Sequence, residues 1–366
     1  IILPGESELP IDPTAMKKIC PKCKTQAKGE TKVLDTWATS SLTPQIISSL
    51  VDNKIKMPYS LRPQGHDIIR TWAFYTIVKA YYHEKSIPWN NIMISGFVTL
   101  GGQKMSKSKG VVVNPNEVIG KYGADALRFW AAGSKLGENL DYREEDVQSG
   151  KKFIIKLKNA SNFVFMNLRD YNGKKPKKLE ELDKRFLEEL NSSIFLCTDY
   201  FRNYEYNKVR SEIEQFFWKD FCDNYLEIVK WRVYNGTKEQ KESAFYVLYN
   251  SLLTILKLLA PVMPFVTEEI YQKYFKANEK TKSIHLCEWP KEGKSKTEKD
   301  LILFYETLSD VRTEKTRAKK AMNSEIILTL VEKNLTKLKD FIDDLKHVTN
   351  AKEIKEGKEF KVEFTD

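Results

Sequence analysis

Histidine and cysteine are scarce in this sequence, with 4 histidines and 5 cysteines among 366 residues. The cysteines stand at positions 20, 23, 197, 222 and 287, an odd number without the dense spacing of small secreted scaffolds, and we recognise no signal peptide. This usage argues against a disulfide-stabilised secreted protein. We therefore expect the protein to be located in the reducing cytoplasm.

Long apolar runs are also missing. A membrane-spanning helix needs about 20 consecutive apolar residues, and the longest candidate, Leu252 to Val266, contains Lys257 and two prolines. The sequence predicts no membrane span. It shows no internal repeat, and it opens with Ile1 in loop-like residues, so we expect it to be a fragment of a longer protein.

The residues that are present describe a folded chain of more than one unit. At 42.6 kDa the chain exceeds the usual size of a single core, and 41% hydrophobic and 12% aromatic residues suffice for globular packing. Sixty Lys and Arg against 50 Asp and Glu leave a net charge of +10. That excess suits a polyanionic partner such as a nucleic acid, but a lysine-rich solvated surface would give the same number.

The first part of the chain has an alternating α/β pattern. A helix-like run over 67–82 is followed by a short strand-like run over 92–96, a glycine-rich loop, and a second helix over 123–132. Such alternation is typical of parallel strands covered by helices. We expect one α/β unit over 1–143.

The middle of the chain lacks strand patterns. Apolar residues recur at helical spacing in 153–168, 186–204, 206–233 and 243–259. Pro261 and Pro264 end the last of these helices, and Thr267 would cap another that reaches about Phe275. The pattern predicts an antiparallel helical bundle over 144–295.

A small α/β module is predicted over 296–366. Its expected elements are a basic helix, Leu308 to Met322, a strand, Ile326 to Val331, a helix, Leu335 to Leu345, and a final strand, Phe360 to Phe364. The basic helix carries five cations that could follow a nucleic-acid backbone or could simply face solvent. They are Arg312, Lys315, Arg317, Lys319 and Lys320.

The segment Lys104-Met105-Ser106-Lys107-Ser108 carries the sharpest chemical signal. It follows Gly101-Gly102, so a glycine-hinged loop presents several ammonium groups. Cations aimed at phosphate oxygens stabilise the charge that develops in phosphoryl or adenylyl transfer. A solvated basic turn is the alternative for an isolated lysine cluster.

This pentapeptide resembles the signature loop of the class I aminoacyl-tRNA synthetases. Upstream, Gly65-His66-Asp67 resembles the family's Gly-x-Asp segment, in which glycine admits the adenosine and aspartate accepts from the ribose hydroxyls. The resemblance implies that ATP binds to Gly65, Asp67 and residues 104–108, with Lys104 and Lys107 as the catalytic cations. Asp67 could also cap the helix that follows it.

The segment around Asp35-Thr36-Trp37 resembles the valyl members of the family most closely, with isoleucyl and leucyl enzymes as alternatives. By that resemblance Trp37, Ile68 and Trp72 would wall the pocket for the valine side chain. Core packing is the alternative for each tryptophan. The resemblance implies that 1–143 is the C-terminal half of the family's Rossmann-like nucleotide-binding domain. It also implies that 144–295 is the helical anticodon-binding domain, which 217–227, 258–265 and 285–290 resemble.

The family's His-x-Gly-His element and its editing domain have no counterpart in this sequence. We therefore expect the chain alone to catalyse adenylation negligibly, or to act in isolation as a non-catalytic tRNA-binding module. The resemblance implies L-valine, valine tRNA and ATP with Mg²⁺ as substrates, and a monomeric enzyme. Cys20 and Cys23 form a Cys-x-x-Cys turn that is either half of a zinc site, whose other two ligands would come from an upstream pair, or a knuckle with free thiols.

Overall fold

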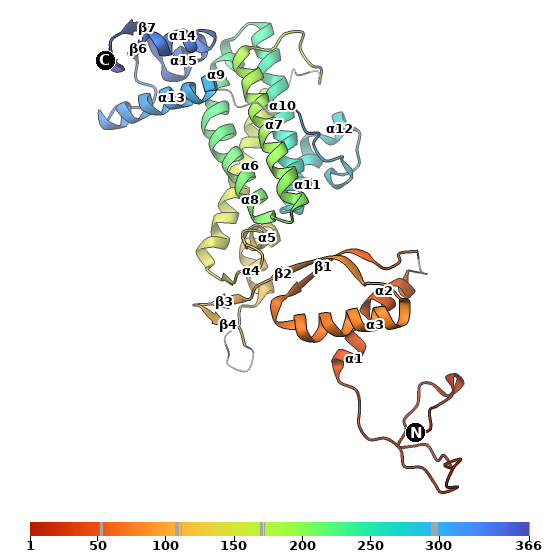
Figure 1. Ribbon diagram of the computed structural model, residues 1–366. Helices are drawn as coiled ribbons and strands as arrows, with labels where there is room; N and C mark the ends of the chain where they lie inside the picture. Colours follow the sequence, from red (N-terminus) through yellow and green to blue (C-terminus); the bar gives the residue numbers. More distant parts are fainter. Residues whose placement is uncertain are drawn as a thin grey trace. The chain divides into compact units, whose positions relative to one another are not determined.

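The computed structural model describes residues 1–51, 54–106, 110, 112–168, 171, 173–293 and 299–365. The chain divides into two compact units, Ile1–Ser95 and Gly96–Asp366. Figure 1 labels their helices and strands. Each unit is described by itself. Among the described helices, none is long and apolar enough to cross a membrane.

The first unit is built around two parallel strands. Its N-terminal stretch contains a short 3-10 helix, η1 (Glu6–Glu8), and an antiparallel bridge between Ile19 and Gln26. The elements that follow are α1 (Thr36–Ser40), α2 (Thr43–Leu50), β1 (Tyr59–Gly65), η2 (His66–Ile68), the π-helix η3 (Ile69–Ala73), α3 (Phe74–Glu84) and β2 (Trp89–Ser95). Strand β1 pairs with β2 in parallel from Tyr59 opposite Trp89 to Gly65 opposite Ser95. The predicted parallel α/β arrangement is confirmed.

The second unit opens with a three-stranded sheet in the order β4-β3-β5. Strand β3 (Val98–Leu100) pairs antiparallel with β4 (Gln103–Lys104) and parallel with β5 (Leu140–Asp141). Between β4 and β5 lie α4 (Pro115–Tyr122) and α5 (Ala124–Ala131). Helix α4 begins where the Asn114 side chain accepts from the Asn116 amide, with proline in the first turn.

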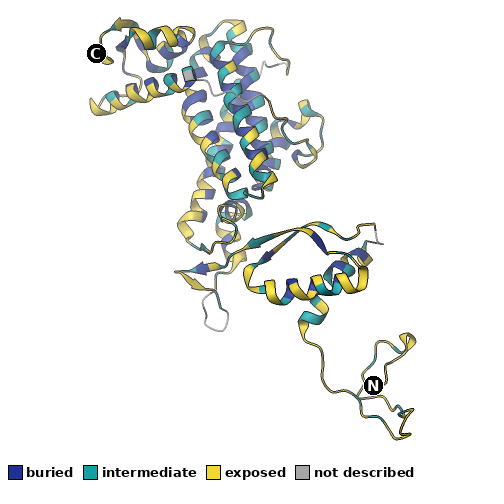
Figure 2. Ribbon diagram, in the orientation of Figure 1, coloured by how far each residue is buried: buried dark blue, intermediate teal, exposed yellow. Residues whose placement is uncertain are grey.

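A helical bundle fills the middle of this unit (Figure 1). Its elements are α6 (Glu144–Asn167), α7 (Glu181–Arg202), α8 (Tyr206–Gln215), the π-helix η5 (Phe216–Tyr225), α9 (Leu226–Asn235), α10 (Lys238–Leu259), α11 (Pro264–Tyr274), α12 (Lys276–Glu279) and the 3-10 helix η6 (Ile284–Leu286). The four predicted apolar helical runs fall on these helices, and the runs over 153–168 and 186–204 extend past the observed ends at Asn167 and Arg202. Their apolar faces are the buried ones in Figure 2, as expected when packing rather than intrinsic propensity stabilises a helix.

Aromatic rings form much of the bundle core. Phe186 stacks on Tyr225 with ring centroids 4.0 Å apart, and Phe153 stacks on Phe129 at 4.9 Å. The second contact joins α6 to α5, so the bundle packs directly against the helices that follow the small sheet.

One predicted helix start is wrong. Helix α11 begins at Pro264 rather than at a cap on Thr267, and Thr267 is buried inside its first turn, where its hydroxyl donates to the Met263 carbonyl at 2.8 Å. Proline is well suited to the first helical position because its missing N–H has no partner there. The punctuating proline therefore opens the new helix.

The C-terminal module is α/β, as predicted. It consists of α13 (Lys299–Arg317), β6 (Ile326–Val331), α14 (Glu332–Lys337), the 3-10 helix η7 (Lys339–Phe341), α15 (Ile342–Thr349), β7 (Ala351–Gly357) and β8 (Lys361–Phe364). The sheet order is β7-β6-β8, with β7 parallel and β8 antiparallel to the central strand. Helix α13 begins and ends earlier than predicted, and the expected helix over 335–345 is split among α14, η7 and α15.

Strand β7 was missed by the sequence analysis. Its residues are mostly charged and exposed, and only Ala351 is buried. The strand lies at the edge of the sheet, where charged side chains are tolerated because one side of the strand faces solvent. Its pairing with β6 is a tertiary contact that local periodicity does not report.

A partly buried carboxylate in the bundle predicts a pH-dependent stability. Glu189 on α7 accepts from the Tyr305 hydroxyl of α13 at 3.0 Å. Burial first, and then the negative charge of Asp220, raises the pKa of Glu189 from 4.5 to about 8, while the Tyr305 hydrogen bond and Lys219 oppose the shift and Glu212 adds to it. The folded state therefore binds this proton more tightly than the unfolded state does.

Stability should consequently be largest below the unfolded pKa of 4.5 for this group, and should be lost as pH rises through about 8. We expect Glu189→Gln, which stays neutral, to remove that loss, as measured by urea unfolding between pH 5 and about pH 9. Glu188→Gln is the control, because this neighbour pairs with Arg185 instead, and it should keep the wild-type pH dependence. Equal pH dependence for both variants would contradict the prediction.

Candidate functional site

The lysine-bearing segment leaves a tight hairpin. Strands β3 and β4 are joined by Gly101 and Gly102, whose φ values are +58° and +76°. A two-residue hairpin with both φ values positive is a type I′ turn, which strongly favours glycine. Lys104 ends β4, exposed, with its Nζ 3.8 Å from the centroid of the Phe97 ring. The glycine pair thus sets the direction in which the segment leaves the sheet.

The rest of the predicted phosphate-binding segment is only partly described. Met105 and Ser106 follow Lys104 and are half-buried. Lys107 and Ser108 lie outside the described residues. Their predicted roles rest on the sequence alone.

Asp141 braces this hairpin from the neighbouring strand. Its Oδ1 accepts from the Gly102 amide at 2.9 Å and from the Thr99 hydroxyl at 2.7 Å. These hydrogen bonds, that from Gly102 first, lower the pKa of Asp141. The sequence analysis missed Asp141, and no local signal could have revealed it, because its two partners lie 39 and 42 residues earlier in the chain.

In the first unit, Gly65 and Asp67 lie together at the carboxyl end of β1. Gly65 is the last residue of the strand, and Asp67 is exposed in the 3-10 helix η2 that follows. A Cβ atom on Gly65 would lie 2.9 Å from Asp67 Oδ1. A side chain at Gly65 would therefore displace the carboxylate. Ligands of parallel α/β sheets bind at this carboxyl edge.

The alternative role of Asp67 as a helix cap is wrong. The cap position of η2 is Gly65 and that of η3 is Ile68, and neither makes a side-chain cap hydrogen bond. His66, between the two candidate residues, has its Nδ1 3.2 Å from the Ser95 carbonyl oxygen. That contact ties the end of β1 to the end of β2.

Trp37, Ile68 and Trp72 lie in one apolar cluster. Trp72 is 6% exposed, and its neighbours in the cluster include Trp89, whose ring it stacks on at 5.3 Å, and the partly buried Trp37 and Ile68. The indole N–H of Trp72 donates to the Ser40 carbonyl at 2.9 Å. Core packing accounts for Trp72 by itself, whereas Trp37 and Ile68 keep accessible surface.

The cysteine pair forms a knuckle in the N-terminal stretch. The Cys20 amide donates to the Thr25 carbonyl at 2.8 Å, and the Lys24 amide donates to the Cys20 carbonyl at 2.9 Å. Cys23 is exposed, and hydrogen bonds from Thr25 and then Cys20 lower its pKa to about 7. Zinc needs four ligands in a structural site. Across the described residues no group of three or more Cys, His, Asp or Glu is placed to hold a metal, so these two thiols alone do not make a zinc site.

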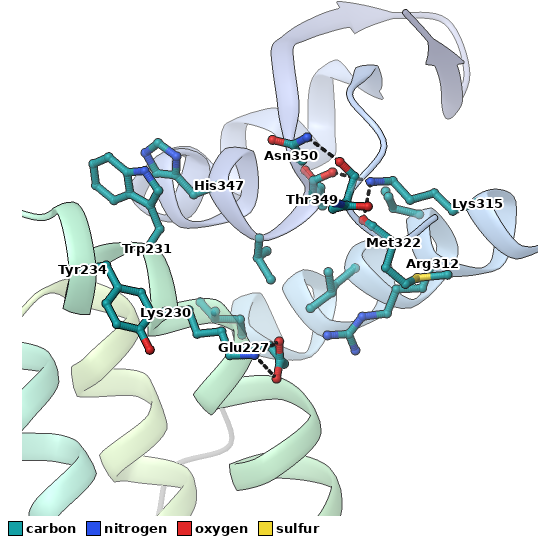
Figure 3. Close-up of a pocket in the computed structure, with 15 residues that line it drawn as sticks. Glu227, Lys230, Trp231, Tyr234, Arg312, Lys315, Met322, His347, Thr349 and Asn350 are labelled. Carbon is teal, nitrogen blue, oxygen red and sulfur yellow. Dashed lines mark hydrogen bonds and ion pairs between the residues drawn. The ribbon is translucent and has the colours of Figure 1, made fainter. Parts of the chain in front are cut away.

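A hollow of about 750 Å³ lies where α9, α13 and the end of α15 meet (Figure 3). Trp231 stacks on His347 with ring centroids 3.6 Å apart at one side, and burial lowers the pKa of His347. Lys230 pairs with Glu227, and Arg312 donates to the Asn224 side chain and the Asp223 carbonyl. The hollow is therefore lined by apolar and aromatic side chains with cations at its margin.

Figure 3 also shows that Lys315 does not belong to a surface stripe of cations. It is 1% exposed, and its Nζ donates to the carbonyls of Met322, Ser324 and Thr349 at 2.7–2.8 Å. Its ammonium holds the turn after α13 against the end of α15. The sequence prediction that it could follow a nucleic-acid backbone is wrong, because its donors all point into the protein.

Lys315→Met should therefore destabilise the protein. The thioether cannot donate to the three carbonyls, and one buried acceptor left unpaired costs about 1–3 kcal/mol. Urea unfolding would measure the change. Lys319→Met is the matched control, since Lys319 is exposed just after the same helix, and we expect a change within about 0.5 kcal/mol. Equal stabilities of the two variants would refute the structural role of Lys315.

Comparison with known proteins adds to this geometry. Residues 183–333 match the family described as "Anticodon-binding domain of tRNA ligase", and residues 9–143 match "tRNA synthetases class I (I, L, M and V)". The chain is 42% identical to a valine-tRNA ligase of Ehrlichia ruminantium over 98% of this chain and 45% of the relative. It is 35% identical to a valine-tRNA ligase of Picrophilus torridus over 96% of this chain and 46% of the relative.

A solved structure shares the fold. The LeuRS of Agrobacterium radiobacter K84, solved as a ternary complex with tRNA and LeuAMS, superposes with a TM-score of 0.56 over 86% of this chain and 37% of that chain, at 18% identity. The chain spans about half the length of the curated relatives it matches. With both family matches and these relatives over nearly all of its length, the chain belongs to the class I aminoacyl-tRNA synthetases, and its relatives are valine-tRNA ligases.

Proposed function

We propose that this chain serves a valine-tRNA ligase reaction, in which L-valine is activated with ATP to valyl-adenylate and then transferred to valine tRNA. The observation that carries the proposal is 35–43% identity to valine-tRNA ligases over 96–98% of the chain. An isoleucyl or leucyl specificity is the alternative within the class. In this proposal, residues 1–143 bind the nucleotide and the amino acid, residues 144–295 bind tRNA, and residues 296–366 form an appended module.

Gly65 and Asp67 would hold the adenosine of ATP. The lack of a side chain at Gly65 supports this role, because it leaves the Asp67 carboxylate in place at the strand end. An exposed carboxylate there can accept hydrogen bonds from ribose hydroxyls. Both residues lie at the sheet edge where nucleotides bind in parallel α/β folds.

Residues 104–108 would bind the triphosphate, with Lys104 and Lys107 as the catalytic cations. When the valine carboxylate attacks the α-phosphate, negative charge builds up on the departing pyrophosphate. Ammonium groups held near it lower that barrier. Mg²⁺ would accompany the ATP phosphates and supply further positive charge there. The type I′ turn before Lys104 supports a defined exit of this segment from the sheet.

Trp37, Ile68 and Trp72 would select the amino acid. Their common apolar cluster supports the assignment. Trp72, fixed by Trp89 and Ser40, would be a rigid wall, and the partly buried Trp37 and Ile68 would face the substrate. Such a pocket excludes a larger side chain by steric clash, but an apolar pocket rejects a similar-sized hydroxyl-bearing one poorly.

The helical part would bind tRNA as a monomer. The match of residues 183–333 to an anticodon-binding family and the net charge of +10 on the whole chain support that role. The five free cysteines are consistent with our proposal that the reaction takes place in the cytoplasm.

Amino-acid-dependent ATP–pyrophosphate exchange tests the function. In the protein at its full natural length, we expect exchange with L-valine and much less with L-isoleucine or L-leucine. Preference for either of the latter would reject the valine assignment. The chain of 366 residues, whose sequence has no His-x-Gly-His element, should show negligible exchange.

A second candidate concerns the chain in isolation, as a non-catalytic tRNA-binding module. The anticodon-binding match over 183–333 favours it. We expect the isolated chain to bind valine tRNA with an affinity that falls steeply as salt rises, because cations neutralising phosphates release counterions. Filter binding between about 50 and 200 mM salt measures this. Salt-independent or undetectable binding would count against the module.

A further inference from the structure

The small sheet at the start of the second unit places one acidic side chain against the turn that leads to the lysine segment. Strand β3 lies between β4 and β5, so Asp141 on β5 is two strands away from Lys104 on β4. The Asp141 carboxylate nevertheless reaches the turn that joins β3 to β4. It does so with one oxygen, Oδ1, shared between Gly102 and Thr99.

The two donors fix both sides of the turn. Thr99 is buried on β3 and precedes the glycines, whereas Gly102 is exposed and comes directly before β4. Glycine has the most flexible backbone of any residue, so two successive glycines restrain the direction of the chain only weakly. A charged acceptor makes a stronger hydrogen bond than a neutral one. The brace therefore restrains the position at which the chain has the most freedom.

Other contacts of Asp141 are weaker. Arg143 Nε lies 3.8 Å from Oδ2, but its side chain is 69% exposed, and exposed pairs contribute little. Asp141 also lies three residues before α6, so the turn is tied to the segment that leads into the bundle. The carboxylate is held by the Gly102 amide and the Thr99 hydroxyl of the hairpin and faces Arg143.

We propose that Asp141 is a positioning residue for the reaction, which holds the Gly101–Gly102 turn so that Lys104 leaves the turn in the orientation needed to reach the triphosphate. This inference rests on the proposed function of Lys104. Asp141 touches no reacting atom and acts through the Gly102 amide.

Backbone amide exchange tests the brace in the chain itself. In Asp141→Ala we expect the Gly102 amide to exchange about tenfold faster, because its acceptor is gone. Asp141→Asn keeps an oxygen acceptor and should recover most of the protection. Glu145→Gln removes one exposed charge nearby on α6 and should leave the exchange unchanged. Wild-type exchange at Gly102 in Asp141→Ala would overturn the brace.

Kinetics at full natural length test the positioning. We expect Asp141→Ala to lower kcat of valine-dependent pyrophosphate exchange by about tenfold, with partial rescue in Asp141→Asn. The KM for L-valine should stay unchanged, because neither Asp141 nor the hairpin is part of the apolar cluster proposed for valine. General unfolding would also lower the apparent kcat, but it would speed amide exchange throughout the chain rather than at Gly102.

The failures of the two proposals are distinguishable. If wild-type protein shows no valine-dependent pyrophosphate exchange, the proposed function fails. The hydrogen exchange of the Gly102 amide still reports on the brace in that case. If the wild type is active and Gly102 is released in Asp141→Ala without any loss of kcat, the positioning role is refuted and the proposed function stands.

Discussion

Replacing Arg232 by alanine should destabilise the protein by about 3–5 kcal/mol, the usual cost of removing one partner from a buried ion pair. Arg232 on α9 is 3% exposed and donates through Nη1 and Nη2 to both oxygens of Asp183, at 2.8 Å each. Its Nε lies 2.8 Å from Asp344 Oδ1 on α15. Without the guanidinium, two buried carboxylates lose their counter-charge.

The surroundings cannot compensate for that loss. Tyr225 and Ser243 already donate to Asp183, at 2.7 and 2.5 Å. Burial raises the pKa of Asp344 to about 6 even with Arg232 present. The cluster joins α7, η5, α9, α10 and α15, so its loss should loosen the C-terminal module from the bundle and open the Trp231–His347 stack beside the hollow.

Urea unfolding of Arg232→Ala provides the measurement. Arg202→Ala is the matched control, because Arg202 also forms a 2.7 Å ion pair, with Glu292, but is 65% exposed. We expect this variant to lose about 0–1 kcal/mol of unfolding free energy. Arg232→Lys keeps the positive charge but not the bidentate hydrogen bonding, so its loss of unfolding free energy should lie between those of the other two variants. A loss in Arg232→Ala no larger than that of the control would show that the buried cluster does not stabilise the fold.

Replacing Lys107 by alanine at full natural length should slow valyl-adenylate formation by about 10²–10³-fold, the typical effect of losing one preorganised donor to developing charge. Lys107 lies outside the described residues, so this expectation rests on its place three positions after Lys104. Lys104→Ala should slow adenylate formation less, since the Lys104 ammonium also lies over the Phe97 ring.

Single-turnover adenylate formation separates this step from tRNA transfer. Lys135→Ala is the control, because Lys135 is 66% exposed and paired with Glu138 outside the segment; its rate should match the wild type. An unchanged rate in Lys107→Ala would remove Lys107 from the catalytic group.

Local patterns predicted the elements with strong periodicity. The strand Ile326–Val331 has the predicted bounds because its apolar residues form the buried centre of a sheet. The long bundle helices were predicted because apolar residues at spacings of three and four mark a buried face. Boundaries were less accurate, as at Pro264 and Thr267, since proline is compatible with both the end of one helix and the start of another.

Parts of the candidate site were also predictable from the sequence. The order Gly65, Asp67 and the lysine segment resembles a known family, and the structure places Gly65 beside Asp67 and gathers Trp37, Ile68 and Trp72. The contacts of Trp89, Ser40 and Asp141 with these elements were not predictable. Each joins positions that lie far apart in the chain, and single-sequence periodicity reports only neighbours.

By itself, the sequence determined the family, the α/β-then-helical order, and the residue types proposed to bind ATP, valine and tRNA, because motif spacing and periodicity are properties of adjacent residues. Only the tertiary structure decided which charges face solvent and which are buried. Lys315 and Arg232 look like ordinary surface cations in a helical pattern, yet both are enclosed. The reason is physical: the cost of burying a charge is offset only by partners that folding brings from distant segments.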